Sequence, residues 1–349
     1  MEAKKWNISV LLACVLLLVL FALPTVVIDP YFHFHAPYAS YFLKNERYQN
    51  DGIVKHFSYN TLVTGTSMTE NFKTSEVDDI FGVTSVKAPF SGASYKEINE
   101  NTVTTIKYKP DLEFIIRGLD VGRLDGEKDV MNYLDTPTYL YDENPFNDVN
   151  YVLNKSIFFE ATYPNYLLIK NGGESTSFDD YVNWAGQFTY GKDAVLETYN
   201  REEKVAQEYS MTDVDRERVI ANIEQNVLET VKSNPQITFY YFLTPYSIVW
   251  WDSINQKGMV KYQIEVQRVV LEQLLLYSNL KVYSWFNDFG LIESLDNYKD
   301  YVYYSGEVNS KMLLWMKEGK GELKEDNYKE YLEEIENFYL NYNYNSLFI

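Results

Sequence analysis

The chain has 349 residues, 46% of them hydrophobic, and a formal net charge of −19. That hydrophobic fraction supports a substantial core and excludes general disorder. The acidic balance, without a basic stripe after the first few residues, excludes a nucleic-acid partner, because phosphate binding needs clustered Lys and Arg. The single cysteine, Cys14, lies in the N-terminal apolar run, so the rest of the chain has no disulfide, thiol catalysis or Cys-based metal site.

The first thirty residues, MEAKKWNISVLLACVLLLVLFALPTVVIDP, predict a membrane-spanning helix. The run from Ile8 to Ile28 is uncharged and has about the 20 residues needed to cross a bilayer. Lys4 and Lys5 precede it, which favours a cytoplasmic N-terminus. The run is longer than a signal-peptide core and lacks an evident cleavage site, although a cleaved signal is the alternative. We expect a single-pass protein of the bacterial cytoplasmic membrane, with its C-terminal domain extracytoplasmic and the lipid bilayer as one partner.

The chain divides into four expected parts. Residues 1–28 form a cytoplasmic stub and the transmembrane helix, and residues 29–55 form an aromatic-rich, membrane-proximal neck. An α/β domain follows over 56–320, interrupted at about 123–210 by an irregular insertion of short helices and loops, rich in Tyr and Asn. Residues 321–349 form an acidic C-terminal helix and a frayed tail.

Strands and helices alternate through the α/β domain. Five segments are expected to be strands: YNTLVTG, VTSVKAP, DLEFIIRGLD, ITFYYFLTP and KVYSWF. Helices are expected over SYKEINENTVTTIKYK, TDVDRERVIANIEQNVLETVKSNP, GMVKYQIEVQRVVLEQLLLYSN and SGEVNSKMLLWMKEG, and Thr212 with Asp215 predicts a capping box. The alternation predicts an α/β fold, a three-layer α/β/α sandwich around a five-stranded, flavodoxin-like parallel sheet.

Ligands of such folds bind beyond the carboxyl ends of the strands, so the residues just after each strand are the candidates for chemistry. Ser67 follows the first strand at a helix start, where it is either a nucleophile or an ordinary N-cap. Gly92 follows the second strand, with an ordinary turn as its alternative reading. Gly118 and Asp120 close the third, LTPYSIVWW after the fourth is expected to be a loop, and Asp300 precedes the last helix of the domain.

This order of residues resembles the SGNH/GDSL hydrolase superfamily. DPYFHFH, GTSMTENF and KDYVYYSGEVNSKML carry the resemblance over roughly residues 29–317. They are similar to the membrane-anchored branch that includes the D-alanine transfer protein of lipoteichoic acid and the alginate acetylation proteins. The resemblance implies that Ser67 is the nucleophile, that its own N–H and that of Gly92 line the oxyanion hole, and that Gly118 and Asp120 form the third block. It also implies work on a cell-envelope polysaccharide or teichoic acid beside a membrane-bound O-acyltransferase, with no metal and no cofactor.

Two positions depart from the family pattern. The third block usually ends in Asn, which donates a hydrogen bond, whereas an ionised Asp120 only accepts one and would repel an oxyanion. The last block pairs Asp with a His three positions later, but Asp300 is followed by Tyr303. A phenol is protonated at pH 7 and is a poor general base.

The three histidines of the chain, His33, His35 and His56, all precede Ser67. The first two are expected in the neck, and His56 is expected to begin the first strand, at the end away from the rim. Ser67 therefore stands where a nucleophile belongs, and its base is missing. Two functions stay open: a non-catalytic ectodomain that binds glycan or docks on an acyltransferase, which the missing His favours, and an active serine esterase or O-acyltransferase. A purely structural role is a third.

Overall fold

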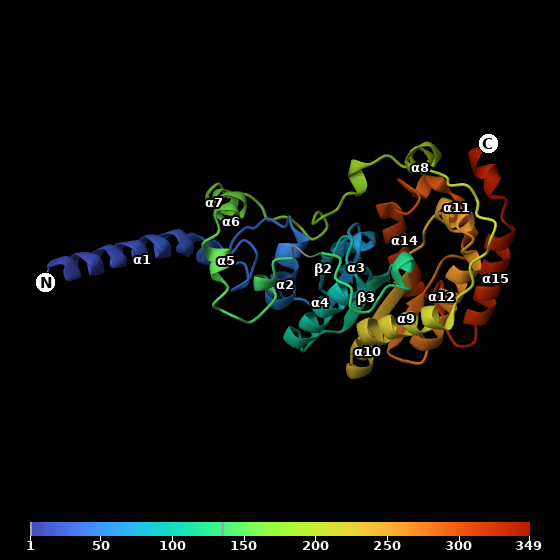
Figure 1. The fold of residues 1–349 in the computed structure, drawn as a ribbon, viewed down its shortest axis with the longest axis horizontal. Helices are drawn as coiled ribbons and strands as arrows, with labels where there is room; N and C mark the ends of the chain where they lie inside the picture. The colour runs from blue at the N-terminus through green and yellow to red at the C-terminus, as the bar shows by residue number, and fades with distance from the viewer. Residues whose placement is uncertain (1, 134–135) are drawn as a thin grey trace.

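The computed structural model describes residues 2–133 and 136–349, and its core is a six-stranded sheet with helices on both faces (Figure 1). The strand order is β2-β1-β3-β4-β5-β6. The first five strands in this order are parallel, and β6 runs antiparallel to β5. The strands are β1 (Thr61–Gly65), β2 (Ser85–Pro89), β3 (Phe114–Leu119), β4 (Thr238–Leu243), β5 (Leu280–Tyr283) and β6 (Glu322–Leu323).

Helices account for most of the remaining described structure. The longer ones are α1 (Glu2–Ile28), α2 (Glu46–His56), α3 (Thr74–Phe81), α4 (Tyr95–Tyr108), α7 (Tyr163–Lys170), α8 (Lys192–Thr198), α9 (Asp213–Ile223), α11 (Ile248–Gln256), α12 (Val260–Leu274), α14 (Gly306–Glu318) and α15 (Tyr328–Asn341). Shorter ones are α5 (Val149–Val152), α6 (Lys155–Ile157), α10 (Glu229–Ser233) and α13 (Phe289–Glu293). The capping box of Thr212 and Asp215 at the start of α9 is confirmed.

Side chains of alternate strand residues show which helices cover each face of the sheet. The Arg117 guanidinium of β3 donates to carbonyls of Tyr95 at the start of α4 and of Asn226 just before α10. On the opposite face, the ring of Tyr240 in β4 packs on Phe81 of α3. Because both faces are covered, the sheet is buried on both sides, as parallel sheets generally are.

The predicted fold class is confirmed: an α/β sandwich around a parallel sheet, preceded by one apolar N-terminal helix. The sheet has six strands, whereas five were predicted. The sixth, β6, was missed because its two residues are too few to show an alternating pattern. The prediction that LTPYSIVWW is a loop is wrong in part. Its second half begins α11, where the Ser247 hydroxyl accepts from the N–H groups of Val249 and Trp250 at 3.2 and 3.4 Å.

Helix α1 is long and apolar enough to cross a membrane. It extends away from the rest of the structure (Figure 1), and nearly all of its apolar side chains are exposed. An N-terminal signal sequence would also meet these criteria of length and apolar composition, so the helix by itself does not establish a membrane anchor. Within the described ranges, no second helix combines this length with this apolar composition.

The expected neck at 29–55 is a folded joint. The buried Asp29 carboxylate accepts hydrogen bonds from the N–H groups of His33, Phe34 and His35 at 2.8–3.0 Å. It also accepts from the Tyr151 hydroxyl of the insertion at 2.8 Å. The expected boundary at 55 falls inside α2, which packs on β2 and α4 and so belongs to the α/β body.

The segment at 123–210 contains short helices and irregular stretches among its described residues, and it touches both ends of the structure. Its α5 contacts α1, and its last part passes beside α11 (Figure 1). There Arg201 forms a two-pronged ion pair with Asp252. The C-terminal tail is packed and not frayed: the ring of Tyr339 in α15 stacks on Trp251 at 3.9 Å, and Tyr344 is buried.

Candidate functional site

The strand order reverses between β1 and β3, so the residues that follow these two strands meet at one rim of the sheet. β1 ends at Gly65, whose φ is +148°. A Cβ there would lie 2.7 Å from the Thr69 side chain, so only glycine fits. This tight exit places Ser67 at the first position of a short 3₁₀ helix, Ser67–Thr69, at the rim of the sheet.

The hydroxyl of Ser67 lies 2.8 Å from the phenol oxygen of Tyr303, 236 residues later. Asp300 shapes the loop that presents this phenol. Its Oδ1 accepts from the N–H groups of Val302 and Tyr303, each at 2.8 Å. Asp300 therefore holds the backbone of Tyr303, and the group that reaches the serine is a phenol.

The three histidines lie away from this contact. His56 ends α2 and does not begin β1, which corrects the expected position, and its Nε2 lies 3.3 Å from the His33 carbonyl. Burial lowers the pKa of His56. His33 Nε2 lies 3.0 Å from Asp148 Oδ1, and His35 Nε2 lies 3.2 Å from the Val26 carbonyl. Each ring is thus engaged in or beside the neck.

The chemical state of Tyr303 follows from its surroundings. Burial raises the pKa of its phenol, and the nearby Glu70 and Asp300 carboxyls raise it further, whereas the hydrogen bond with Ser67 acts in the opposite direction. The net direction is upward from 10.0, so the phenol is neutral at pH 7. A neutral phenol cannot accept the serine proton efficiently.

Asp120 lies just beyond β3. Its carboxylate accepts from the hydroxyl of Tyr246 and, at 3.3 Å, from that of Thr66, and Arg123 Nε lies 3.6 Å away. Burial raises the pKa of Asp120. Gly118 lies within β3, where a Cβ would approach the Thr69 side chain to 2.9 Å. Gly118 therefore allows β3 to pack closely against the Ser67–Thr69 turn.

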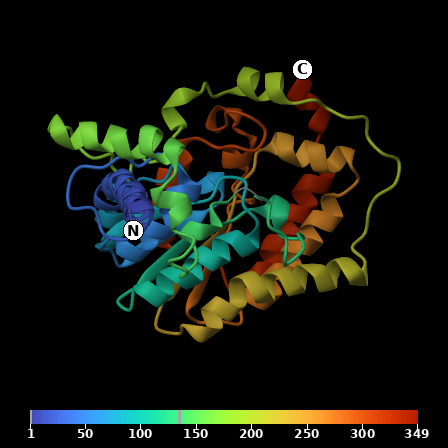
Figure 2. The same ribbon diagram turned by 60° about the vertical axis from the view of Figure 1, so that its left-hand side comes forward.

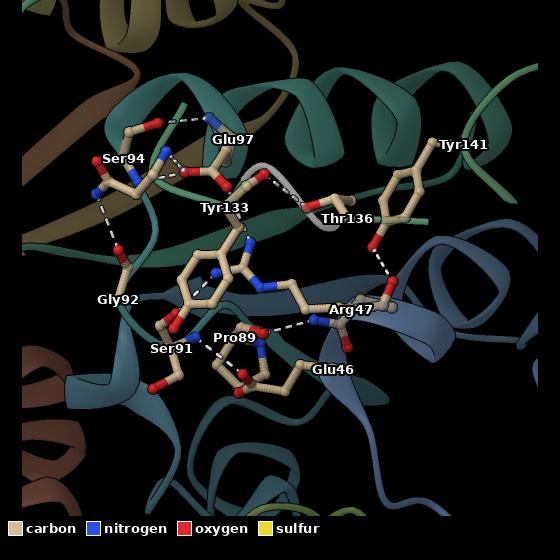
Figure 3. Close-up of polar contacts among 12 residues, drawn as sticks. Glu46, Arg47, Pro89, Ser91, Gly92, Ser94, Glu97, Tyr133, Thr136 and Tyr141 are labelled. Atoms are coloured by element: carbon tan, nitrogen blue, oxygen red, sulfur yellow. Dashed lines mark hydrogen bonds and ion pairs between the residues drawn. The ribbon is translucent and has the colours of Figure 1, made fainter. Parts of the chain in front are cut away.

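Gly92 lies in the turn after β2, with a φ of +66° that L residues rarely adopt. The ring of Tyr133 lies against it, so that a Cβ would be 3.1 Å from the phenol oxygen (Figure 3). The Arg47 guanidinium stacks on this ring at 3.8 Å and donates to the Ser91 carbonyl at 2.7 Å. The turn is therefore held from two sides, by α2 and by the insertion.

Two buried carboxyls of this region, Glu70 and Glu46, were not predicted from the sequence. Glu70 lies one turn after Ser67, a spacing that was visible in the sequence. Glu46, which begins α2, gave no signal; its Oε2 accepts from the N–H of Ser91 at 2.8 Å. Burial raises the pKa of both carboxyls, and the proximity of Glu70 raises that of Glu46 further. This pair makes the rim acidic and favours a shared proton.

The acidic pair predicts a pH dependence of stability. Because the pKa of Glu70 is raised above its ordinary 4.5 in the folded protein, its stabilising protonated state is lost as pH rises through the raised value. Between pH 4.5 and the raised pKa, the free energy of unfolding should fall by up to about 1.4 kcal/mol per pH unit for one proton. Glu70→Gln should flatten this slope in urea unfolding across a pH series. The exposed-site control Glu203→Gln should keep it, and an unchanged slope in both variants would contradict the assignment.

A hollow of about 440 Å³ has Asn71 and Ser305 in its lining, close in sequence to Ser67 and Tyr303, which do not line it themselves. Trp184, between the lining residues Asn183 and Ala185, meets the ring of Tyr303 edge-on at 5.4 Å, and its backbone N–H donates to Asn71 Oδ1 at 3.1 Å. The hollow is lined mainly by hydrogen-bonding side chains: Asn71, Lys73, Asn183, Tyr190, Asp296, Ser305, Glu307 and Ser310, with Ala185, Gly186 and Gly306. In the part of the chain that the structure describes, no three or more His, Cys, Asp or Glu side chains come together as a group that could hold a metal ion.

Comparison with known proteins gives little further identification. No protein-family model and no curated protein matches the sequence. A solved structure from Streptococcus pneumonia, described as a platelet activating factor, aligns with 82% of this chain and 91% of its own chain. Its identity is 11% and its TM-score 0.40, which is too distant to assign a family or an activity.

Proposed function

We propose that this protein is a membrane-anchored, extracytoplasmic SGNH-like protein whose hydrolytic apparatus is degenerate. It assists the acyl modification, acetyl or D-alanyl, or the handling of a cell-envelope glycopolymer by binding the glycan or a partner such as a membrane-bound O-acyltransferase. The observation that carries this proposal is the 2.8 Å contact between the hydroxyl of Ser67 and the phenol of Tyr303. Without a base, a triad keeps only the roughly 10³–10⁴-fold enhancement of its oxyanion hole and binding contacts.

The hollow that Asn71 and Ser305 help to line supports a binding role. Its volume of about 440 Å³ suits one or two sugar rings, since small-molecule sites are typically about 300–1,000 Å³. Its amide, hydroxyl and carboxylate side chains offer the donors and acceptors that sugar hydroxyls require. Tyr190 adds an aromatic ring on which a sugar face can pack.

The test separates catalysis from binding at the same rim. We expect the purified full-length protein to resist labelling by a fluorophosphonate probe. Cells that carry Ser67→Ala should keep the acylation of their envelope polymer, whereas cells that lack the gene should lose it. Labelling at Ser67, or a Ser67→Ala defect equal to the deletion, would instead establish the alternative, an active serine esterase or O-acyltransferase.

Glycan binding in the hollow is tested by a separate variant. A Cβ at Gly186, in the lining of the hollow, would have no neighbouring atom within 4 Å, so Gly186→Phe adds a ring at the hollow without a clash at its Cβ. It should weaken binding of solubilised envelope glycan by about tenfold or more, on the order of 1.4 kcal/mol, in calorimetry. Ala206→Phe, at an exposed position outside the hollow, is the matched control. Equal affinity in the two variants would contradict glycan binding in the hollow.

A further inference from the structure

A segment of the insertion, from Lys155 to Lys170, lies beside the last turns of α1. It consists of α6, a π-helical turn at Phe158–Thr162, and α7. The ring of Phe158 stacks on that of Phe21 at 5.0 Å, and the Thr162 hydroxyl lies 3.0 Å from that of Thr25. Figures 1 and 2 show that the segment runs across the axis of α1 and not along it.

The position of the Phe21–Phe158 contact along α1 indicates how deep the segment would lie in a membrane. Phe21 lies seven residues before the helix ends at Ile28, which is about 10 Å at 1.5 Å per residue. The α1 sequence stays uncharged over these residues, with Thr25 as its polar side chain. If α1 spans a bilayer, the crossing segment therefore lies at the depth of the outer membrane interface, where amphipathic helices bury their apolar face by about 5–10 Å.

The exposed residues of the segment are mainly aromatic rings and lysines, the residue types found at that interface, with one carboxylate, Glu160. Phe159, Tyr163 and Tyr166 are spaced by four and three residues, so they lie on one helical face, and each is about half exposed. Lys155 and Lys170 continue the same spacing at its two ends and are exposed. The opposite face, with Ile157, Thr162 and Asn165, is buried against the protein.

We propose that Lys155–Lys170 is an interfacial helix whose aromatic stripe, Phe159, Tyr163 and Tyr166, inserts into the outer leaflet. Tyr rings are enriched at membrane interfaces, where their apolar body and polar tip are both accommodated. The two lysines reach lipid phosphates from the ends of the stripe. This inference rests on the anchoring part of the proposed function, because it requires α1 to be in the bilayer.

Neighbouring contacts make the joint rigid. At the end of α1 the Val27 carbonyl accepts a hydrogen bond from the Tyr38 hydroxyl, and the Val26 carbonyl lies 3.2 Å from His35 Nε2. Asp29 then ties the neck to Tyr151 of the insertion. With α1 and a crosswise helix both in the membrane, the α/β domain and its rim are held in one orientation to the bilayer.

The test uses the full chain in proteoliposomes. In a Cys14→Ser background, a fluorophore is attached at F159C, Y166C, L16C within α1, or V214C on the exposed face of α9. Lipids with a nitroxide high on the acyl chain quench an interfacial label, whereas aqueous iodide quenches an exposed one. Labels at 159 and 166 should be quenched by shallow nitroxide lipid and shielded from iodide. The label at 16 should respond to nitroxide near the bilayer centre, and the label at 214 to iodide alone.

The outcomes separate the two claims. If the label at 16 responds to deep nitroxide while those at 159 and 166 respond only to iodide, anchoring holds and the interfacial helix is overturned. If the label at 16 also responds only to iodide, anchoring fails, and the interfacial helix fails with it. Because both aromatic positions are exposed, their replacement does not disturb the core.

Discussion

Replacing Tyr303 by His and Asp120 by Asn together should give Ser67 a reactivity that the wild-type protein lacks. The first change supplies a base with a pKa near the working pH, and the second replaces a repulsive carboxylate with a hydrogen-bond donor. General-base catalysis contributes about 10²–10⁴-fold, so hydrolysis of an acetyl ester should rise on the order of 10²-fold or more over the wild type. Fluorophosphonate labelling at Ser67, read by mass spectrometry, is the second measurement.

The geometry of the loop supports this expectation. The Asp300 turn already brings position 303 to the serine, with the phenol oxygen 2.8 Å from the hydroxyl. Imidazole is shorter than phenol, so its Nε2 reaches Ser67 through a small loop movement or one bridging water. Tyr303→His alone should gain less than the double variant, and Tyr303→Phe with Asp120→Asn should gain nothing. A folded but unreactive double variant would mean that the site lacks more than a base and a donor.

The contact between Ser67 and Tyr303 shows what the sequence can predict about this site. Ser67 follows β1, and Tyr303 lies in the segment between β5 and α14. The order of these elements in a parallel sheet brings the two residues to one rim. The capping box of α9 was likewise visible, because it depends on residues three apart. Such features depend on local spacing and on topology, both of which the sequence carries.

The rest of the site depends on contacts between distant segments. Glu46 reaches the Ser91 turn from α2, and Trp184 reaches Tyr303 from the insertion, and neither follows a strand of the sheet. His56 was predicted to begin the first strand, whereas it ends α2, a helix that the sequence did not reveal because it has little apolar periodicity. Its buried residues include Gln49, Asn50 and Asp51, which are hydrogen-bonded or ion-paired in this structure.

Arg201→Ala should destabilise the protein by about 3 kcal/mol or more, because it leaves a buried carboxylate without its cation. Asp252 is fully buried, and Arg201 approaches it with Nε at 2.8 Å and Nη2 at 3.0 Å. Tyr199 and Gln256 donate to the same carboxylate at 3.0 and 2.8 Å. These neutral donors remain in the variant, but they cannot supply the missing positive charge.

The urea midpoint of the full chain in detergent is the measurement, and two further variants interpret it. Lys204→Ala removes a nearby exposed cation that bonds only Asn255, at 3.0 Å, among the described residues, and should change stability by less than about 0.5 kcal/mol. Adding Asp252→Asn to Arg201→Ala should recover part of the loss, because the buried charge disappears with its partner. A loss that persists undiminished in the double variant would show that Arg201 acts through packing, for instance on the Phe348 ring 4.4 Å from its guanidinium carbon. Recovery would show that this ion pair fastens the end of the insertion to α11.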